Sequence, residues 1–220
     1  LNKENVMQVI ENKALLLTLR NPGKITTVIP KSKDLGNNQV LVHWNLEEAQ
    51  VLKNLQIKNV PSPILGRYDW PGRYKPFEHQ RDTASFLTLH RRAFVLSEQG
   101  TGKTGSVIWA ADYLMSIKKI KRVLIVCPLS IMDAAWRSDL FNFAMHRTVD
   151  IAHGAKDKRK KIIESDAEFV IINYDGLNIV EEDIKKAGFD LIVVDEANAY
   201  KNAQTTRWKT LSRILTPDTW

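Results

Sequence analysis

One glycine-rich run decides the fold of most of this 220-residue chain: Ser97-Glu98-Gln99-Gly100-Thr101-Gly102-Lys103-Thr104. A short apolar run, Ala93–Leu96, precedes it, and a helical pattern over Lys103–Ile117 follows it. Such a turn between a strand and a helix binds phosphate, because its backbone N–H groups and the positive end of the helix dipole face the anion. The run therefore predicts a nucleotide phosphate site.

Each residue type of the loop has a place in that chemistry. Glycines let the backbone wrap the phosphates, Lys103 supplies a positive charge, and the hydroxyl of Thr104 is a ligand for Mg²⁺. Ser97 stands where the first glycine of such loops is usual. The predicted phosphate-binding set is Ser97, Gln99, Gly100, Thr101, Gly102, Lys103 and Thr104.

A second motif, an apolar run that ends in two acids, supports the first. Leu191–Val194 reads as a buried strand, and Asp195 and Glu196 follow it directly. Ligands of parallel sheets bind beyond the carboxyl ends of the strands, so these acids are expected beside the phosphate loop. Asp195 is then a candidate Mg²⁺ ligand, and Glu196 is the candidate that orients and deprotonates water. The predicted cofactors are ATP and Mg²⁺, and the predicted catalytic residues are Lys103, Asp195 and Glu196.

A third element points to the base of the nucleotide. Gln80 precedes the loop by about twenty residues, and a glutamine amide both donates and accepts hydrogen bonds, as the edge of adenine does. Phe77 lies close by in sequence and offers a ring that stacks on a base. We therefore add Gln80 and Phe77 to the nucleotide-binding set.

The remaining apolar runs predict a parallel sheet. Arg122–Cys127, Val149–Ala152, Phe169–Asn173 and Leu191–Val194 are continuous rather than alternating, which is typical of strands covered on both faces. Helical patterns separate them, over Met132–Phe143, from Lys156 onward, and between the last two strands. This order predicts an α/β sandwich of three layers over residues 71–220.

Residues 1–70 predict a small α+β module. Strands are expected over Ala14–Arg20, Ile25–Ile29 and Gln39–Trp44, and a helix capped by Asn45 is expected over Leu46–Leu55. Residues 60–76 are rich in proline and glycine, so we place the boundary between the domains there.

Composition narrows the class of protein. The chain is 44% hydrophobic and 26% charged, as globular proteins are, and its single cysteine, Cys127, excludes an internal disulfide framework and a multi-cysteine zinc site. The single cysteine also predicts a reducing, cytoplasmic setting. We find no apolar run of about 20 residues, the length that crosses a bilayer, and therefore expect no membrane span. The net charge of +7 is spread along the chain and is compatible with a polyanionic partner.

Together, Gln80, the loop and Asp195-Glu196-Ala197-Asn198 resemble the first RecA-like domain of superfamily 2 helicases. Further stretches narrow the resemblance to Swi/Snf-type DNA translocases. They are Val126-Cys127-Pro128-Leu129-Ser130 followed by Trp136, the run Ile171-Ile172-Asn173-Tyr174-Asp175-Gly176-Leu177, and Ala199-Tyr200-Lys201-Asn202.

The resemblance implies a RecA-like ATP-binding lobe that acts on duplex DNA together with a second RecA-like domain. The family's next motif, on a further strand, is not present in the sequence, so an incomplete first lobe is expected. The resemblance also implies nucleic-acid contacts at Pro128, Leu129, Ser130, Asn173 and Tyr174. Asn198 stands where the family has histidine, and Asn173 stands where it has threonine.

Three functions remain open at this stage. The first is an ATP-dependent helicase or translocase that couples hydrolysis to movement on DNA. The second is the motor subunit of a restriction enzyme. The third is a nucleotide switch or nucleic-acid-binding module without motor activity.

Overall fold

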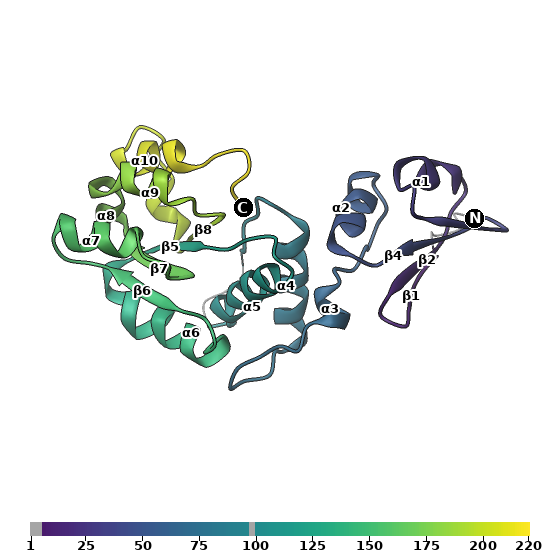
Figure 1. The fold of residues 1–220 in the computed structure, drawn as a ribbon, viewed down its shortest axis with the longest axis horizontal. Helices are drawn as coiled ribbons and strands as arrows, with labels where there is room; N and C mark the ends of the chain where they lie inside the picture. Colours follow the sequence, from purple (N-terminus) through teal and green to yellow (C-terminus); the bar gives the residue numbers. More distant parts are fainter. Residues whose placement is uncertain (1–5, 97–99) are drawn as a thin grey trace. The chain divides into compact units, whose positions relative to one another are not determined.

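The computed structural model describes residues 6–96 and 100–220, and the chain divides into two compact units (Figure 1). One unit holds residues 1–69 and 81–93, and the other holds residues 70–80 and 94–220. Helix α4 (Glu78–Leu89) therefore contributes to both units. A four-residue helix, α3 (Ile64–Arg67), lies within the proline-rich segment in which we placed the domain boundary.

The first unit contains a four-stranded antiparallel sheet. Its strands are β1 (Val6–Ile10), β2 (Ala14–Thr18), β3 (Lys33–Gly36) and β4 (Gln39–His43), in the order β1-β2-β4-β3. Leu15 and Leu17 of β2, and Val40 and Val42 of β4, are fully buried and alternate with half-buried neighbours. This period of two shows that one face of the sheet is covered.

Two expectations for the first unit need correction. The segment Ile25–Ile29 is not a strand, because helix α1 runs over Gly23–Val28. Pro22 starts the helical turn, and Ile25 and Ile29 lie four residues apart and are both buried. Helix α2 (Leu46–Asn54) forms as predicted with Asn45 at its N-cap position, but the side chain of Asn45 does not cap the helix, because its oxygen accepts a hydrogen bond from Arg67 (3.0 Å).

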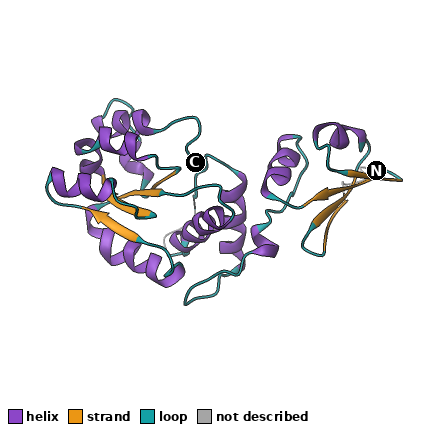
Figure 2. Cartoon of the chain, viewed as in Figure 1, coloured by secondary structure: helices purple, strands orange, loops and turns teal. Residues whose placement is uncertain are grey.

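The second unit is built on a four-stranded parallel sheet, in the order β6-β7-β5-β8 (Figure 2). Its strands are β5 (Val123–Cys127), β6 (Val149–Ala152), β7 (Phe169–Asn173) and β8 (Leu191–Val194). Every residue of β5 and β7 is buried, so both faces of the central strands are covered. The predicted α/β architecture is confirmed, with a separate antiparallel sheet ahead of it.

Helices cover the two faces of the parallel sheet (Figure 1). Helix α5 (Lys103–Ser116), the π-helical segment η2 (Met132–Arg137) and helix α6 (Ser138–Phe143) pack on one face. Helices α8 (Tyr174–Ile179), α9 (Glu181–Ala187) and α10 (Thr206–Ile214) pack on the other, where Leu124 and Val126 share a core with Leu177 and Ile214. Helix α7 (Lys156–Ile163) packs on the outer strand β6.

The strand expected over Ala93–Leu96 does not form, and this prediction is wrong. Phe94 and Leu96 are 79% and 93% exposed, and neither residue pairs with another strand among the described residues. β8 is the edge strand next to β5. On its other side it bonds only to Trp220 among the described residues: the N–H of Trp220 donates to the carbonyl of Asp190, and the N–H of Ile192 donates to the carbonyl of Trp220. A strand needs a neighbour, and in the described structure the run at 93–96 has none.

No helix of the described residues is both long enough and apolar enough to cross a membrane.

Helices α9 and α10 are tied together by a charged cluster around Glu181. Arg213 donates from Nε and Nη2 to the two oxygens of Glu181 (2.6 and 2.7 Å), and Lys185 lies 2.9 Å from the same carboxylate. The hydrogen bonds from Arg213 hold the pKa of Glu181 at about 2, against the opposing effect of burial. The carboxylate is therefore ionised at neutral pH.

Glu181→Gln should lower the free energy of unfolding by about 1 kcal/mol at pH 7, because solvent around the half-exposed Arg213 screens the pair. A depressed pKa stabilises the fold above the unfolded value of about 4.3, and this stabilisation is lost as the pH falls toward 2. The difference between wild type and variant should therefore shrink across that range in urea melts. Glu182→Gln on the same helix is the control, and a difference that does not change between pH 7 and pH 2.5 would contradict the assignment.

Candidate nucleotide-binding site

The glycine loop leads into a deeply buried helix. α5 begins at Lys103, and most of its residues from Gly105 to Met115 are buried. Gly100 and Gly102 have φ values of +80° and +73°, a region that glycine enters without steric cost. Lys103 and Thr104 are half-buried in the first turn of α5. Ser97 and Gln99 lie outside the described residues, so their predicted contacts remain predictions.

Gln80 fixes the chain next to the loop. Its side chain is buried, its Nε2 donates to the carbonyl of Gly102 (3.1 Å), and its Oε1 accepts from the N–H of Phe77 (2.9 Å). A Cβ at Gly102 would overlap Nε2 of Gln80. This position therefore favours glycine both for its positive φ and for lack of space. In the structure the amide of Gln80 is thus used to join the turn at residue 77 to the loop. Its contact with adenine remains a prediction.

Phe77 presents an aromatic face beside this turn. Its ring is 69% exposed and stacks on His79, with ring centres 5.7 Å apart and planes 9° from parallel. Nε2 of His79 in turn lies 3.0 Å from the carbonyl of Thr101 in the loop. The predicted aromatic is therefore available to a flat ligand and is held close to the loop.

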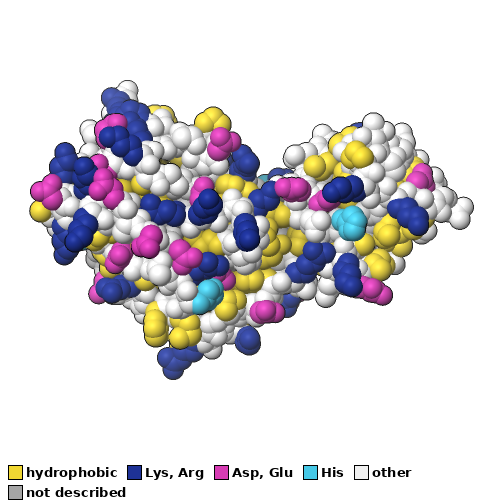
Figure 3. All heavy atoms as spheres, in the orientation of Figure 1, with side chains coloured by type: hydrophobic (Ala, Val, Ile, Leu, Met, Phe, Trp, Pro, Cys, Tyr) yellow, Lys and Arg dark blue, Asp and Glu magenta, His cyan; other side chains and the backbone are white. Residues whose placement is uncertain are grey.

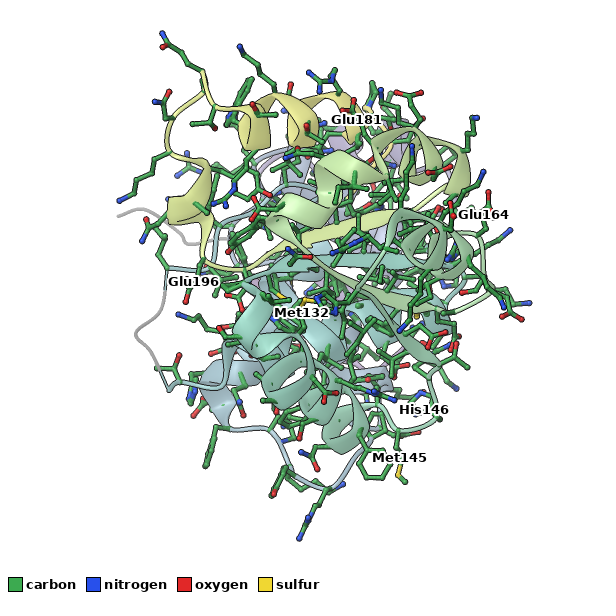
Figure 4. All side chains as sticks on the ribbon, turned by 90° about the vertical axis from the view of Figure 1, so that its left-hand side faces the viewer. Met132, Met145, His146, Glu164, Glu181 and Glu196 are labelled. Carbon is green, nitrogen blue, oxygen red and sulfur yellow. The ribbon has the colours of Figure 1, made fainter. Side chains whose placement is uncertain are left out.

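Every polar group of Asp195 makes a hydrogen bond. The position of the next residue, Glu196, is labelled in Figure 4. Its backbone N–H donates to Val126 of β5 (2.9 Å), and its carbonyl accepts from the hydroxyl of Tyr174 (2.5 Å). Oδ1 accepts from the N–H of Glu196 (2.9 Å), and Oδ2 accepts from the indole N–H of Trp136 (2.9 Å). Each carboxylate oxygen keeps further lone-pair capacity for a cation or its water. The carboxylate is therefore preorganised.

Glu196 has strained backbone geometry. Its φ of +52° and ψ of +59° place it in the left-handed region, which costs a residue with a Cβ about 1 kcal/mol or more. Its side chain is exposed at the carboxyl end of the sheet, opposite the end at which His146 and Glu164 lie (Figure 4). Such strain concentrates at functional sites, and here it turns Glu196 out of the strand direction directly after Asp195.

The five candidate nucleic-acid residues fall into two groups. Leu129 is 56% exposed, Ser130 is exposed and Pro128 is half-buried, so these three lie at the surface after β5. Asn173 and Tyr174 are buried, and their polar atoms bond within the protein. In this structure they shape the carboxyl edge of the sheet, and their contact with nucleic acid remains a prediction.

Arg159 explains the position of Asn173. This buried arginine of α7 donates from Nη1 to the carbonyl of Ala152 (2.7 Å) and to Oδ1 of Asn173 (3.0 Å), and from Nε to the carbonyl of Gly154 (2.8 Å). Burial lowers the pKa of Arg159. The guanidinium thus joins the carboxyl ends of β6 and β7.

The donor set suits a magnesium nucleotide better than a protein-only metal site. No group of three metal-ligating side chains occurs among the described residues. Mg²⁺ usually takes one or two carboxylates and completes its shell with water and phosphate oxygens. Asp195 offers a fixed carboxylate, and Thr104 offers a hydroxyl in the first turn of α5. The chemistry of these two side chains fits Mg²⁺, and their joint binding of the ion with a nucleotide remains a prediction.

The sequence matches the family described as the SNF2-related domain over residues 29–220. The chain belongs to the SNF2-related family. Helicase SWR1 of Saccharomyces cerevisiae is 30% identical over 172 residues, which are 74% of this chain and 11% of that protein. An uncharacterized ATP-dependent helicase of Mycoplasma genitalium is 32% identical over 121 residues, or 53% of this chain and 11% of the relative.

A solved structure supports the same assignment. The SWI2/SNF2 ATPase core of Sulfolobus solfataricus, in complex with dsDNA, matches with a TM-score of 0.57 and 25% identity. The match covers 64% of this chain and 30% of that one. The SNF2-related chain therefore spans 11% of the two curated relatives named above and less than a third of the matched structure.

Two contacts of this SNF2-related domain were not predicted. In the sequence, Trp136 stands out only because it follows the run Val126–Ser130. In the structure its indole N–H donates to Asp195, 59 positions along the chain. Arg159 was one of several basic residues, and only its burial distinguishes it. A helical wheel over α7 carries one weak signal, since Arg159 and Ile163 lie four residues apart on the buried side.

Cys127 gives this region a chemical probe. The thiol is fully buried at the end of β5, and burial, followed by the negative charge of Asp195, raises its pKa to about 12. At pH 8 an exposed thiol is about a quarter ionised, whereas Cys127 is almost entirely protonated. Iodoacetamide should therefore label the native chain at least about 100-fold more slowly than the chain unfolded in guanidinium. Native labelling within about tenfold of the unfolded rate would contradict the buried position.

Proposed function

We propose that this chain is the ATP-binding part of a DNA translocase. It binds Mg-ATP, and within a longer protein it works with a second RecA-like domain to couple hydrolysis to movement along duplex DNA. The observation that carries the proposal is the pairing of a glycine loop at the start of a buried helix with an acid held rigidly at the end of β8. Membership of a family that contains ATP-dependent helicases supports it.

The residues of the site take separate roles in this proposal. Lys103, in the first turn of α5, neutralises charge on the phosphates, and the backbone of Gly100–Gly102 wraps them. Glu196 orients the attacking water and accepts its proton. Magnesium, when bound, neutralises charge that develops on the phosphate oxygens. Asp195 and Thr104 would hold it, and Phe77 would stack on the base.

The proposed partner is duplex DNA, gripped through its phosphates rather than read by sequence. The solved relative is an ATPase core in complex with dsDNA, which favours this partner over RNA. Figure 3 shows Lys and Arg side chains interspersed with acidic ones over the visible face. A few local groups of basic residues, rather than one large positive surface, would therefore hold the phosphate backbone of the DNA. The proposed contacts are Pro128, Leu129 and Ser130, at the surface after β5, and the lysines of α7. Contacts by Asn173 and Tyr174 remain predictions.

Hydrolysis by the chain alone is expected to be slow. In phosphoryl transfer an arginine finger contributes about 10³ to 10⁵ in rate. In this proposal the second RecA-like domain supplies that arginine, so binding of nucleotide rather than turnover is the property to test on this chain.

Lys103→Ala should weaken binding of a fluorescent ATP analogue at least about tenfold, because it removes the charge opposite the phosphates. Lys209→Ala is the matched control, since Lys209 is an exposed lysine on α10 of the same unit. Fluorescence anisotropy measures both affinities, and circular dichroism verifies folding. Equal affinities for the two variants would contradict the assignment of the loop.

Duplex DNA binding should weaken steeply with salt. The slope of log K against log[salt] is negative, and its magnitude decreases by about 0.9 for each phosphate contact that is lost. Replacing the exposed lysines Lys156, Lys158 and Lys161 with glutamine should therefore reduce the slope by about 2 to 3. Binding curves from 50 to 300 mM salt measure it.

The control for that experiment carries the same change of net charge in the other unit. Lys24, Lys31 and Lys58 are exposed there, and their replacement by glutamine should leave the slope nearly unchanged. Equal slopes for both triple variants would show that only net charge matters and would remove α7 from the interface.

A further inference from the structure

We propose that Trp136 is a positioning residue for the magnesium nucleotide, because it fixes the orientation of the Asp195 carboxylate. The inference rests on the proposed function and adds to it a residue outside the predicted site set. Trp136 is 3% exposed, and its only polar group, the indole N–H, donates to Oδ2 of Asp195 at 2.9 Å.

The other contacts of Asp195 fix its backbone more firmly than its carboxylate. The backbone of Asp195 is anchored to β5 and to Tyr174, but these contacts do not stop the carboxylate from rotating about its Cβ–Cγ bond. Oδ1 is held by the adjacent N–H of Glu196, which moves with the same turn. Among the described residues, the indole of Trp136 therefore supplies the only hydrogen bond to the carboxylate that comes from another element.

The local backbone places the indole for this role. Trp136 lies on η2 (Met132–Arg137), a π-helical segment, and such segments are frequent at functional sites because they redirect side chains relative to an α-helix. Met132, on the same segment, is also buried. The buried side of η2 therefore carries a donor directed at Asp195, while the 3₁₀ turn before it (Leu129–Ile131) carries the exposed Leu129 and Ser130.

This arrangement gives the segment 128–137 a connection to the cation site. Its first residues lie at the surface proposed for DNA, and its Trp136 holds the proposed Mg²⁺ ligand. A shift of the segment would thereby change the orientation of Asp195. Partners that orient a metal ligand are worth about 10- to 100-fold in metal affinity.

Trp136→Phe removes the N–H and keeps a ring in the core. The matched control is Trp109→Phe, because Trp109 is equally buried in the same unit and donates its indole N–H to the carbonyl of Pro71 over the same 2.9 Å. Both variants lose one buried indole hydrogen bond, and only the first loses a bond to Asp195. Thermal melts by circular dichroism compare their general loss of stability.

The readout is binding of a fluorescent ATP analogue titrated with Mg²⁺ and, separately, in EDTA. Trp136→Phe should raise the Mg²⁺ concentration for half-maximal binding about 10- to 100-fold and leave the affinity in EDTA unchanged. Trp109→Phe should change neither. If the two variants require the same Mg²⁺ concentration, the inference is overturned. If the wild type shows no Mg²⁺-dependent binding, the proposed function itself fails.

A second measurement covers the case in which Trp136→Phe does not fold. Benzothienylalanine at position 136 keeps the size of tryptophan and replaces the indole N–H with sulfur. It should reproduce the raised Mg²⁺ requirement in a folded chain. An unchanged Mg²⁺ requirement in that protein would overturn the inference.

Discussion

The parallel pairing of β8 with β5 is the constraint on which the candidate site depends. Val194 lies opposite Val126, and the N–H of Asp195 continues the ladder by donating to the carbonyl of Val126. This pairing fixes the point at which Asp195 leaves the sheet. Once that point is fixed, Trp136 and Tyr174 reach Asp195 from two other elements, and Glu196 is forced into its left-handed turn.

Burial of both faces of the sheet makes that pairing stable. β5 and β7 are fully buried and lie between α5, η2 and α6 on one face and α8, α9 and α10 on the other. Continuous apolar runs such as Val123–Cys127 and Phe169–Asn173 have this composition because neither face meets water. The same feature made these strands predictable from sequence, together with the helices that follow them. The glycine loop was predictable because its residue types have few other uses at the start of a helix.

Features that depend on distant partners were not predictable. β-branched residues at 25–29 favour a strand, but Pro22 and the burial of Ile25 and Ile29 on one side produce a helix. The run Ala93–Leu96 has the composition of a strand and finds no neighbouring strand in the described structure. Asn45 is a residue type that caps helices, yet its side-chain oxygen accepts a hydrogen bond from Arg67, 22 residues away. The contact between Trp136 and Asp195 spans 59 positions, and local sequence carries no trace of it.

The central claim is that Asp195 and the glycine loop hold one cation together with a nucleotide. Electron paramagnetic resonance of Mn²⁺, used in place of Mg²⁺, tests it directly in titrations of the wild type and Asp195→Asn. The account predicts one Mn²⁺ per chain that binds only when ATP is present, and a large loss of that binding in Asp195→Asn. Equal Mn²⁺ binding by the two proteins, or binding that does not depend on ATP, would contradict it.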